Sequence, residues 1–383
     1  MYLKRQISAK IKKSLSLTPA TAILGARQTG KTTFVKHLLK NYKSAFYLDL
    51  EKPSDRNMLN EAEHFFMINN NKLICLDEIQ LVPDLFPVIR SIIDDDDYNI
   101  KFLVTGSASP NLLRQSSESL AGRIAYFELS PFLLQEISEK EKLENYWLKG
   151  GFPLSLLSTD NELSNDWRQN FILTFLERDL QNFGFNIPPE TLHRLWKMIA
   201  HLNGQILNYS QLSNSLGYSD TTIRKYIDIL SNTYMLRILQ PYHFNIKKRL
   251  IKSPKIYIRD TGILNTLLNI NDFNELFTHP VYGSSWEILC IENIINTFKN
   301  WEPFYYRTSN GNEIDLVLIR ANKKIAIEFK TSTSPTVSKG FWNALDDLKT
   351  DMAFIIAPVK MAYPYKNNVW IYPINEFLKL KLL

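Results

Sequence analysis

The chain has 383 residues, 45% of them hydrophobic, and a formal net charge of +6. This length exceeds one ordinary hydrophobic core, so two to four domains are expected. Its two cysteines, Cys75 and Cys290, lie in apolar stretches without metal-ligand or paired-thiol spacing, so neither a disulfide framework nor a zinc site is indicated. No apolar run approaches the roughly 20 residues of a membrane span, and no signal-peptide core follows the basic N-terminus. We therefore expect a cytoplasmic protein without a membrane partner.

The first third of the chain alternates short apolar runs with helical patterns, as in a parallel sheet covered by helices. Helices are expected between the strands, for example at residues 32–39 and 86–93. After Ser130 the strand pattern stops, and a helical lid or linker is predicted up to residue 190. Strands are predicted at residues 21–24, 45–50, 73–76, 101–105 and 124–129.

Residues 25–32, GARQTGKT, match the phosphate-binding pattern G-x-x-x-x-G-K-[ST] between an apolar strand and a helix. In such a loop the backbone amides face the phosphates, Lys31 reaches the β- and γ-phosphates, and the hydroxyl of Thr32 binds Mg²⁺. ATP is the expected nucleotide. The predicted nucleotide-binding residues are Gly25, Ala26, Arg27, Gln28, Thr29, Gly30, Lys31, Thr32 and Thr33.

The apolar run at residues 73–76 is followed by two acids, which predicts the Walker B strand that accompanies a P-loop. Asp77 would hold Mg²⁺, and Glu78 would polarise the attacking water. The alternative is that both acids only cap a turn. Two consecutive acids favour hydrolysis over mere binding.

Two further catalytic candidates lie downstream. Ser107, or in second place Thr105, ends a buried strand where a polar side chain could sense the γ-phosphate; a plain turn is the alternative. Arg123 could stabilise the transferring phosphoryl group, in cis or from a neighbouring subunit, or be a surface arginine. A trans-acting Arg123 would require a homo-oligomer.

Residues 191–260 contain eleven Lys and Arg against three Asp and Glu, so this segment carries +8. It has helix-turn-helix form, followed by two strands that enclose a basic wing. This predicts a DNA-binding winged helix, although a winged helix used only for packing is the alternative. The predicted DNA contacts are Thr221, Thr222, Arg224 and Lys225 on the second helix, and Lys247, Lys248, Arg249 and Lys252 in the wing.

The order α-β-β-β-α-β expected for the last hundred residues resembles that of the PD-(D/E)XK nuclease core. Glu287 lies on the helix at 284–298, and alternation along a strand brings Glu328 and Lys330 to one face. Glu287, Asp315 and Glu328 would bind Mg²⁺ or Mn²⁺, and Lys330 would position or activate water. The alternative is an inactive, nuclease-derived binding domain.

Several further motifs are familiar, among them LDEIQ, SLAGR, GGFP at residues 150–153, LERDL at 176–180 and KIYIRDTGIL at 255–264. With them the whole chain resembles the bacterial and archaeal AAA-type P-loop ATPases that carry a C-terminal domain of unknown function with a restriction-nuclease-like fold. The resemblance implies ATP and Mg²⁺ at the P-loop, and it makes Arg178 a candidate for sensing nucleotide.

The predicted fold is therefore a multidomain α/β protein with an AAA-type parallel sheet. Its domains are an ATPase core at 1–130, a helical lid at 131–190, a winged helix at 191–260 and a nuclease-like domain at 261–383. We expect an ATPase whose nucleotide state positions the winged helix and the nuclease-like domain on DNA. The alternative is a non-catalytic, ATP-responsive regulator that binds DNA or protein.

Overall fold

The computed structural model describes residues 2–107, 119–137, 141–182, 185, 187–243 and 250–382. The chain divides into two compact units, residues 1–132 with 232–234, and residues 133–231 with 235–383. Across the described part of the chain, no helix is long and apolar enough to cross a membrane.

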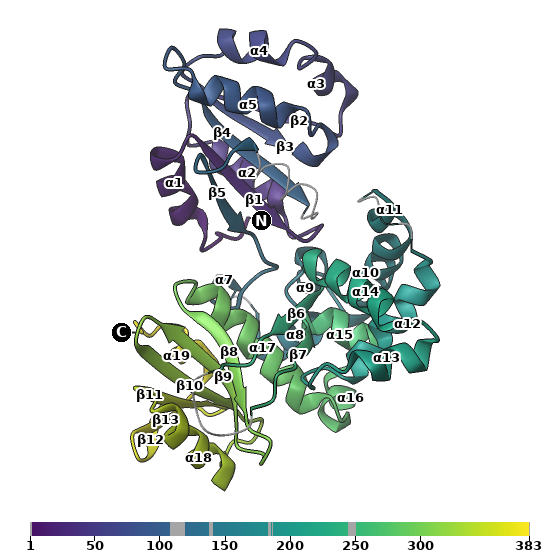
Figure 1. The fold of residues 1–383 in the computed structure, drawn as a ribbon, viewed down its shortest axis with the longest axis vertical. Helices are drawn as coiled ribbons and strands as arrows, with labels where there is room; N and C mark the ends of the chain where they lie inside the picture. The colour runs from purple at the N-terminus through teal and green to yellow at the C-terminus, as the bar shows by residue number, and fades with distance from the viewer. Residues whose placement is uncertain are drawn as a thin grey trace. The chain divides into compact units, whose positions relative to one another are not determined.

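The first unit is built on a five-stranded sheet in the order β2-β3-β4-β1-β5, with all neighbouring strands parallel (Figure 1). All five predicted strands are confirmed, with ends that differ by one or two residues. The strands are β1 Ala20–Gly25, β2 Ala45–Asp49, β3 Leu73–Asp77, β4 Lys101–Ser107 and β5 Ile124–Glu128.

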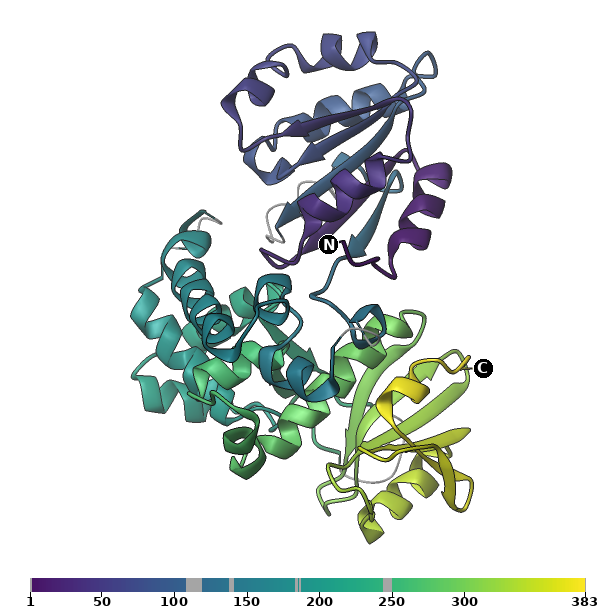
Figure 2. The ribbon, with the colours of Figure 1, turned by 180° about the vertical axis from the view of Figure 1, so that it is seen from behind.

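Helices cover both faces of this sheet (Figure 2). Apolar residues of α1 and α2, such as Ile11 and Phe34, pack on one face, and those of α4 and α5, such as Phe66 and Ile89, pack on the other. The apolar stripe of α5 has the spacing that one buried helix face requires. The helices are α1 Ser8–Leu17, α2 Lys31–Leu39, α3 Pro53–Asn57, α4 Ala62–Ile68, η1 Ile79–Leu81 and α5 Leu85–Asp94.

The second unit begins with short helices, as predicted for the lid. Trp167, Phe171 and Phe175 stack in a row with ring centroids 5.3 and 6.3 Å apart. The row continues into a π-helical turn, η2. The elements are α7 Leu134–Ile137, α8 Leu143–Lys149, α9 Pro153–Leu156, α10 Asn161–Thr174, η2 Phe175–Asp179 and α11 Leu180–Asn182.

The basic segment contains the three helices and two antiparallel strands that its pattern predicted. Gly217 has a φ of 72°, which permits the tight turn between the second and third helices. The elements are α12 Pro189–His201, α13 Tyr209–Leu216, α14 Asp220–Asn232, β6 Leu236–Leu239 and β7 Lys255–Ile258.

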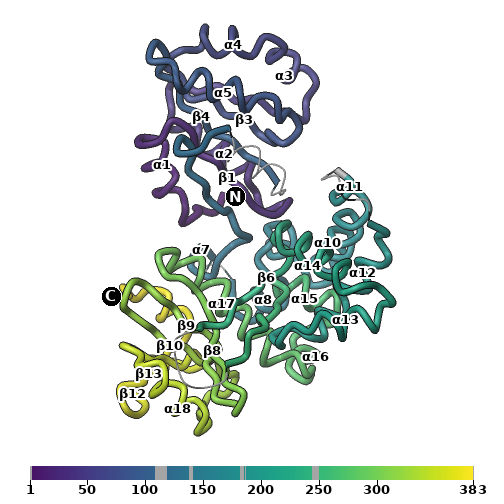
Figure 3. The backbone as a smooth tube through the Cα atoms, viewed as in Figure 1, coloured from purple at the N-terminus to yellow at the C-terminus, as the bar shows by residue number. Residues whose placement is uncertain are grey.

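A mixed six-stranded sheet in the order β12-β13-β11-β10-β9-β8 forms the C-terminal part (Figure 3). The predicted order of helix and strands is found from α17 to β11, and β12, β13 and α19 follow it. The elements are α17 Tyr282–Thr297, β8 Glu302–Arg307, β9 Glu313–Arg320, β10 Lys323–Phe329, α18 Lys339–Leu348, β11 Met352–Ile356, β12 Tyr363–Lys366, β13 Val369–Tyr372 and α19 Ile374–Phe377.

Backbone hydrogen bonds join the basic segment to this C-terminal sheet. Tyr242 donates to the carbonyl of Tyr305 on β8 at 2.7 Å, and Ile251 donates to that of Arg307 at 3.1 Å. Between the two parts, helices α15 (Thr261–Leu267) and α16 (Phe273–Thr278) contact α8. The predicted boundary at residue 261 therefore falls inside one compact unit.

Candidate functional site

The phosphate-binding loop connects the end of β1 to the start of α2. Gly25 ends the strand, and a Cβ there would lie 2.4 Å from the carbonyl oxygen of Leu129, so only glycine fits. Gln28 and Gly30 have φ values of 62° and 89°, in the left-handed region. The backbone thus takes two left-handed conformations where the motif predicts a cradle for phosphate.

The ammonium of Lys31 is buried, and it donates hydrogen bonds to carbonyl groups of the loop itself. It donates to the carbonyl oxygens of Gly25 at 3.1 Å and Ala26 at 2.9 Å. Burial lowers its pKa, although the charges of Glu78 and Asp77 oppose that shift. Thr33 is exposed, and Arg27 forms an ion pair of 3.7 Å with Glu51.

Asp77, at the end of β3, is the meeting point of three hydroxyl groups. Thr32 donates to its Oδ2 at 2.8 Å, Tyr47 donates to the same oxygen at 2.6 Å, and Thr105 donates to Oδ1. The three donors come from α2, β2 and β4. The adjacent strands therefore fix both oxygens of this buried carboxylate.

Glu78 follows with a φ of 60°, a left-handed conformation that turns the chain away from the sheet. Its backbone amide donates to Thr105 Oγ1 at 3.3 Å. Its carboxylate accepts hydrogen bonds from the side chains of Gln80 and, at 3.5 Å, of Ser107. Both predicted sensor residues thus contact the Walker B acids, Thr105 at Asp77 and Ser107 at Glu78.

The oxygen donors at this site fit Mg²⁺. The hydroxyl of Thr32 and the carboxylate of Asp77 lie 2.8 Å apart at the carboxyl edge of the sheet. Hard oxygen ligands of this kind are those that Mg²⁺ takes from protein in nucleotide sites, where substrate phosphates complete the coordination.

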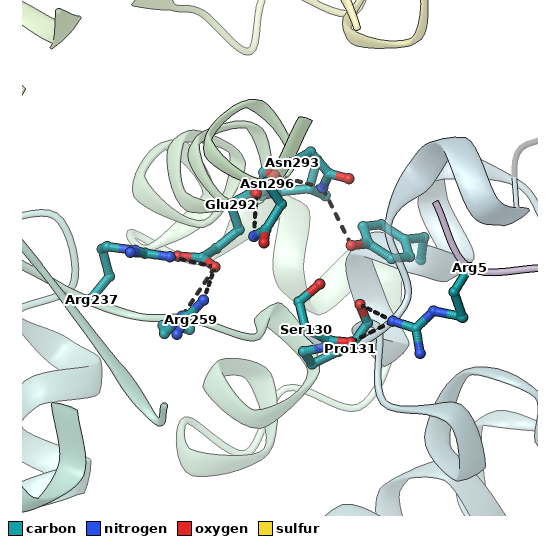
Figure 4. Close-up of polar contacts among 10 residues, drawn as sticks. Arg5, Ser130, Pro131, Arg237, Arg259, Glu292, Asn293 and Asn296 are labelled. Carbon is teal, nitrogen blue, oxygen red and sulfur yellow. Dashed lines mark hydrogen bonds and ion pairs between the residues drawn. The ribbon is translucent and has the colours of Figure 1, made fainter. Parts of the chain in front are cut away.

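Three residues that the sequence did not single out support the site. Tyr47 orients Asp77 and Gln80 holds Glu78. Arg5, which is 3% exposed, donates to the carbonyl of Thr29 in the P-loop at 3.1 Å and to those of Ser130 and Pro131 (Figure 4). A basic residue before the first helix gave no local signal for this contact, because its partners are distant in the chain.

Comparisons with known proteins agree with this geometry. A family model described as an AAA domain matches residues 17–138, and models of two domains of unknown function, DUF8612 and DUF4143, match residues 140–274 and 282–377. The uncharacterized protein Rv2008c of Mycobacterium tuberculosis is 36% identical over 376 residues, which cover 98% of this chain and 84% of that protein. The chain belongs to the family of that protein.

Two other proteins are similar to this chain at lower identity. The uncharacterized protein MJ1544 of Methanocaldococcus jannaschii is 25% identical over 362 residues. The match covers 86% of this chain and 79% of MJ1544. A solved Walker-type ATPase of Pyrococcus abyssi matches 70% of this chain and 96% of its own at 15% identity, with a TM-score of 0.49. The match to the AAA-domain model includes the P-loop and both Walker B acids of this chain. The protein is therefore a P-loop ATPase-like nucleotide-binding protein.

Arg123 lies at the opposite edge of the sheet from the P-loop. It directly precedes β5, whose first residue, Ile124, pairs with the first residue of β1, Ala20. The six residues of β1 separate the two edges by about 20 Å. Arg123 also forms an ion pair with Asp94. The predicted cis role of Arg123 is therefore wrong, and only the trans role stays a prediction.

The predicted DNA contacts on α14 lie on its outer side. Thr221, Arg224 and Lys225 are exposed, and Thr222 is half-buried. The guanidinium of Arg224 lies 3.7 Å from the ring centroid of Tyr209 on α13. Lys252 is exposed, whereas Lys247, Lys248 and Arg249 lie outside the described residues.

Of the eight basic residues of this segment that the structure describes, three face inward. Arg237 and Arg259 form ion pairs of 2.6 and 2.8 Å with Glu292 on α17 (Figure 4). Lys255 is buried among other carboxylates of the C-terminal part. The predicted charge of +8 is thus partly used for packing and is not all available to a partner.

Two of the four predicted C-terminal residues, Glu287 and Asp315, lie around Lys255. Its ammonium lies 3.3 Å from Glu287 and 3.6 Å from Asp315, while Lys330 pairs with Glu328 at 2.8 Å. Burial raises the pKa of Glu287 to about 7 and that of Glu328 to about 8. Within the described ranges, no group of three or more His, Cys, Asp or Glu could hold a metal ion. With an ammonium in their midst, these acids do not fit the predicted metal.

Two family motifs meet inside the second unit. Asp260 caps α15 by accepting from the amide of Ile263 at 2.9 Å, and it also accepts from the amide of Gly151 at 2.8 Å. The motifs GGFP and KIYIRDTGIL therefore pack against each other, which assigns both a structural role. Arg178 is exposed on η2, and its sensing role stays a prediction.

Proposed function

We propose that this protein hydrolyses ATP at its P-loop. The observation that carries the proposal is the pair of acids at the end of β3, with Asp77 tied to the P-loop hydroxyl of Thr32 and Glu78 free of that tie. One acid would serve the metal and the other the water. Two carboxylates in two environments divide these tasks in the way that hydrolysis requires.

In the proposed reaction, Lys31 exchanges the carbonyl oxygens of Gly25 and Ala26 for phosphate oxygens when ATP binds. Glu78 accepts a proton from water, the water oxygen bonds to the γ-phosphorus, and the bond from that phosphorus to the β–γ bridging oxygen breaks, giving ADP and phosphate. Bound Mg²⁺, held by Thr32 and Asp77, would neutralise phosphate charge. Ser107 and Gln80 would set the direction of the Glu78 carboxylate.

The test separates binding from hydrolysis in two variants. Glu78→Gln is expected to bind ATP with near wild-type affinity and to lose phosphate release by about a hundredfold or more, because it removes only the base. Lys31→Ala is expected to lose ATP binding as well. Glu63→Gln, a variant of an exposed acid on α4, is the matched control. Phosphate release from Glu78→Gln at the wild-type rate would exclude the proposal.

We also propose that the second unit binds DNA through α14. The supporting observation is the exposure of Thr221, Arg224 and Lys225 on one helix, with Lys252 exposed on the segment before β7. The affinity for duplex DNA should then fall steeply with salt concentration, since phosphate contacts release counterions.

A charge-removing variant sharpens this test. Lys225→Gln is expected to lower the slope of log affinity against log salt by about one, whereas Lys339→Gln, an exposed lysine on α18, should leave it unchanged. A flat salt response of the wild-type protein would point to a protein partner instead.

For the C-terminal domain we propose a nuclease-like fold in a non-catalytic role. The observation that favours this second candidate over an endonuclease is Lys255 among its carboxylates. Incubation of duplex DNA with the protein and Mn²⁺ should leave the DNA intact. If the wild type cleaves the DNA and Asp315→Ala does not, the C-terminal domain is an active endonuclease.

A further inference from the structure

The side chain of Lys255 is buried in a ring of acidic groups. Only 4% of it is exposed, and its ammonium lies 2.8 Å from Glu313, 3.3 Å from Glu287 and 3.6 Å from Asp315. These carboxylates come from α17 and β9, whereas Lys255 comes from β7, the second strand of the basic segment. The ring of Tyr305, 5.5 Å away, borders the same space.

The cluster also holds a second donor. The phenol of Tyr257 on β7 donates to Glu287 Oε1, the same oxygen that lies 3.3 Å from the ammonium of Lys255. A cation buried with several acids at these distances compensates their charge, as a metal ion would.

Hydrogen bonds also hold the carboxylates of Asp315 and Glu328 in place. Asp315 accepts from the backbone amide of Phe329 at 3.0 Å, which fixes its orientation. Glu328 is 8% exposed, and one of its oxygens accepts from Lys330. Its other oxygen, Oε2, is buried and has no hydrogen-bond partner among the residues that the structure describes. A buried carboxylate oxygen without a hydrogen-bond partner could serve as a ligand for a metal ion.

We propose that the ammonium of Lys255 is the resident cation of this carboxylate cluster and closes a divalent-cation site that the cluster would otherwise form. The lysine then has two consequences at once. It prevents Mg²⁺ or Mn²⁺ from binding, and it ties β7 to α17 and β9. The proposal concerns only the second unit, so it stands or falls independently of ATP hydrolysis at the P-loop.

The test is a titration of the full-length, nucleotide-free protein with Mn²⁺. Binding is measured as the decrease in the electron paramagnetic resonance signal of free Mn²⁺. Wild type and Lys339→Met, a variant of an exposed lysine on α18, should bind no Mn²⁺ that depends on Asp315. Lys255→Met should gain one Mn²⁺ per chain that neither of these two proteins binds. The double variant Lys255→Met, Asp315→Asn should lose that ion, which separates this site from any ion at the P-loop.

Two results would overturn the proposal. One is a Mn²⁺ ion on the wild-type protein that disappears in Asp315→Asn, because Lys255 would then not exclude the metal. The other is a folded Lys255→Met protein that gains no ion. Should Lys255→Met melt at a lower temperature, Mn²⁺ is expected to raise the melting temperature of this variant and not that of the wild type, by mass action; a variant that Mn²⁺ cannot rescue would also count against the proposal.

Discussion

At the scale of single residues, the site is organised around Asp77. Its position was predictable because an acid that directly follows an apolar strand must emerge at the carboxyl edge of the sheet. Tyr47 was not predictable, since its contact with Asp77 depends on the pairing of β2 with β3, two strands that are far apart in sequence. Arg123 shows the opposite case: its place directly before a strand already indicated the amino edge.

Removal of the Tyr47 hydroxyl tests how far this orientation matters. Tyr47→Phe is expected to slow phosphate release by about tenfold while ATP affinity changes less, because residues that orient a metal-binding carboxylate typically contribute that much. The measurement is a comparison of kcat and of the dissociation constant for ATP. Tyr42→Phe, three residues beyond the end of α2, is the matched control, and a Tyr47→Phe protein with wild-type kcat would contradict the assigned role.

At the scale of elements, the loop between α8 and α9 is locked to the start of α15. Gly150 has a φ of 73°, and a Cβ there would lie 2.1 Å from Asp260. The sequence showed GGFP and KIYIRDTGIL only as two separate motifs. Their contact is a long-range packing feature that local patterns do not carry.

Gly150→Ala should therefore destabilise the second unit more than the left-handed backbone alone requires. Gly217→Ala is the matched control, because Gly217 has a φ of 72° and open space around its Cβ position. The control should cost about 1–2 kcal/mol of unfolding free energy, and Gly150→Ala clearly more. Equal midpoints of urea denaturation for the two variants would show that the contact with Asp260 adds nothing.

Helix α17 is held to the basic segment by a buried ion triad. Burial alone would raise the pKa of Glu292, but Arg237 and Arg259 outweigh it and lower that pKa to about 2. Glu292→Gln removes the carboxylate with which both arginines pair, and it should cost about 3–5 kcal/mol at neutral pH. Glu190→Gln, which breaks an exposed pair with Arg194, should cost little.

The pH dependence of this effect has a definite sign. Because the pKa of Glu292 is depressed from 4.5 to about 2 in the folded protein, its stabilisation is complete above pH 4.5 and is lost as the pH falls towards 2. The difference in melting temperature between wild type and Glu292→Gln should shrink over that range. A difference that stays constant down to pH 2 would contradict the assignment.

At the scale of the whole molecule, composition predicted a basic segment but could not predict which charges reach the surface. Acids of the C-terminal part form ion pairs with Arg237, Lys255 and Arg259. Backbone hydrogen bonds join the same segment to β8. The sequence suggested two separate domains here, because charge and helix periodicity are local properties whereas ion pairing across elements is not. The fold of the first unit was predicted almost completely, since its strands are short, apolar and separated by clear helices.

The most direct test of the central claim is the rate of phosphate release from ATP by the full-length protein, measured with and without duplex DNA. An ATPase that acts through a DNA-binding second unit should release phosphate in the presence of Mg²⁺, and DNA should change that rate in the wild type while Glu78→Gln stays inactive under both conditions. Release by the wild type that equals release by Glu78→Gln, with or without DNA, would contradict the account.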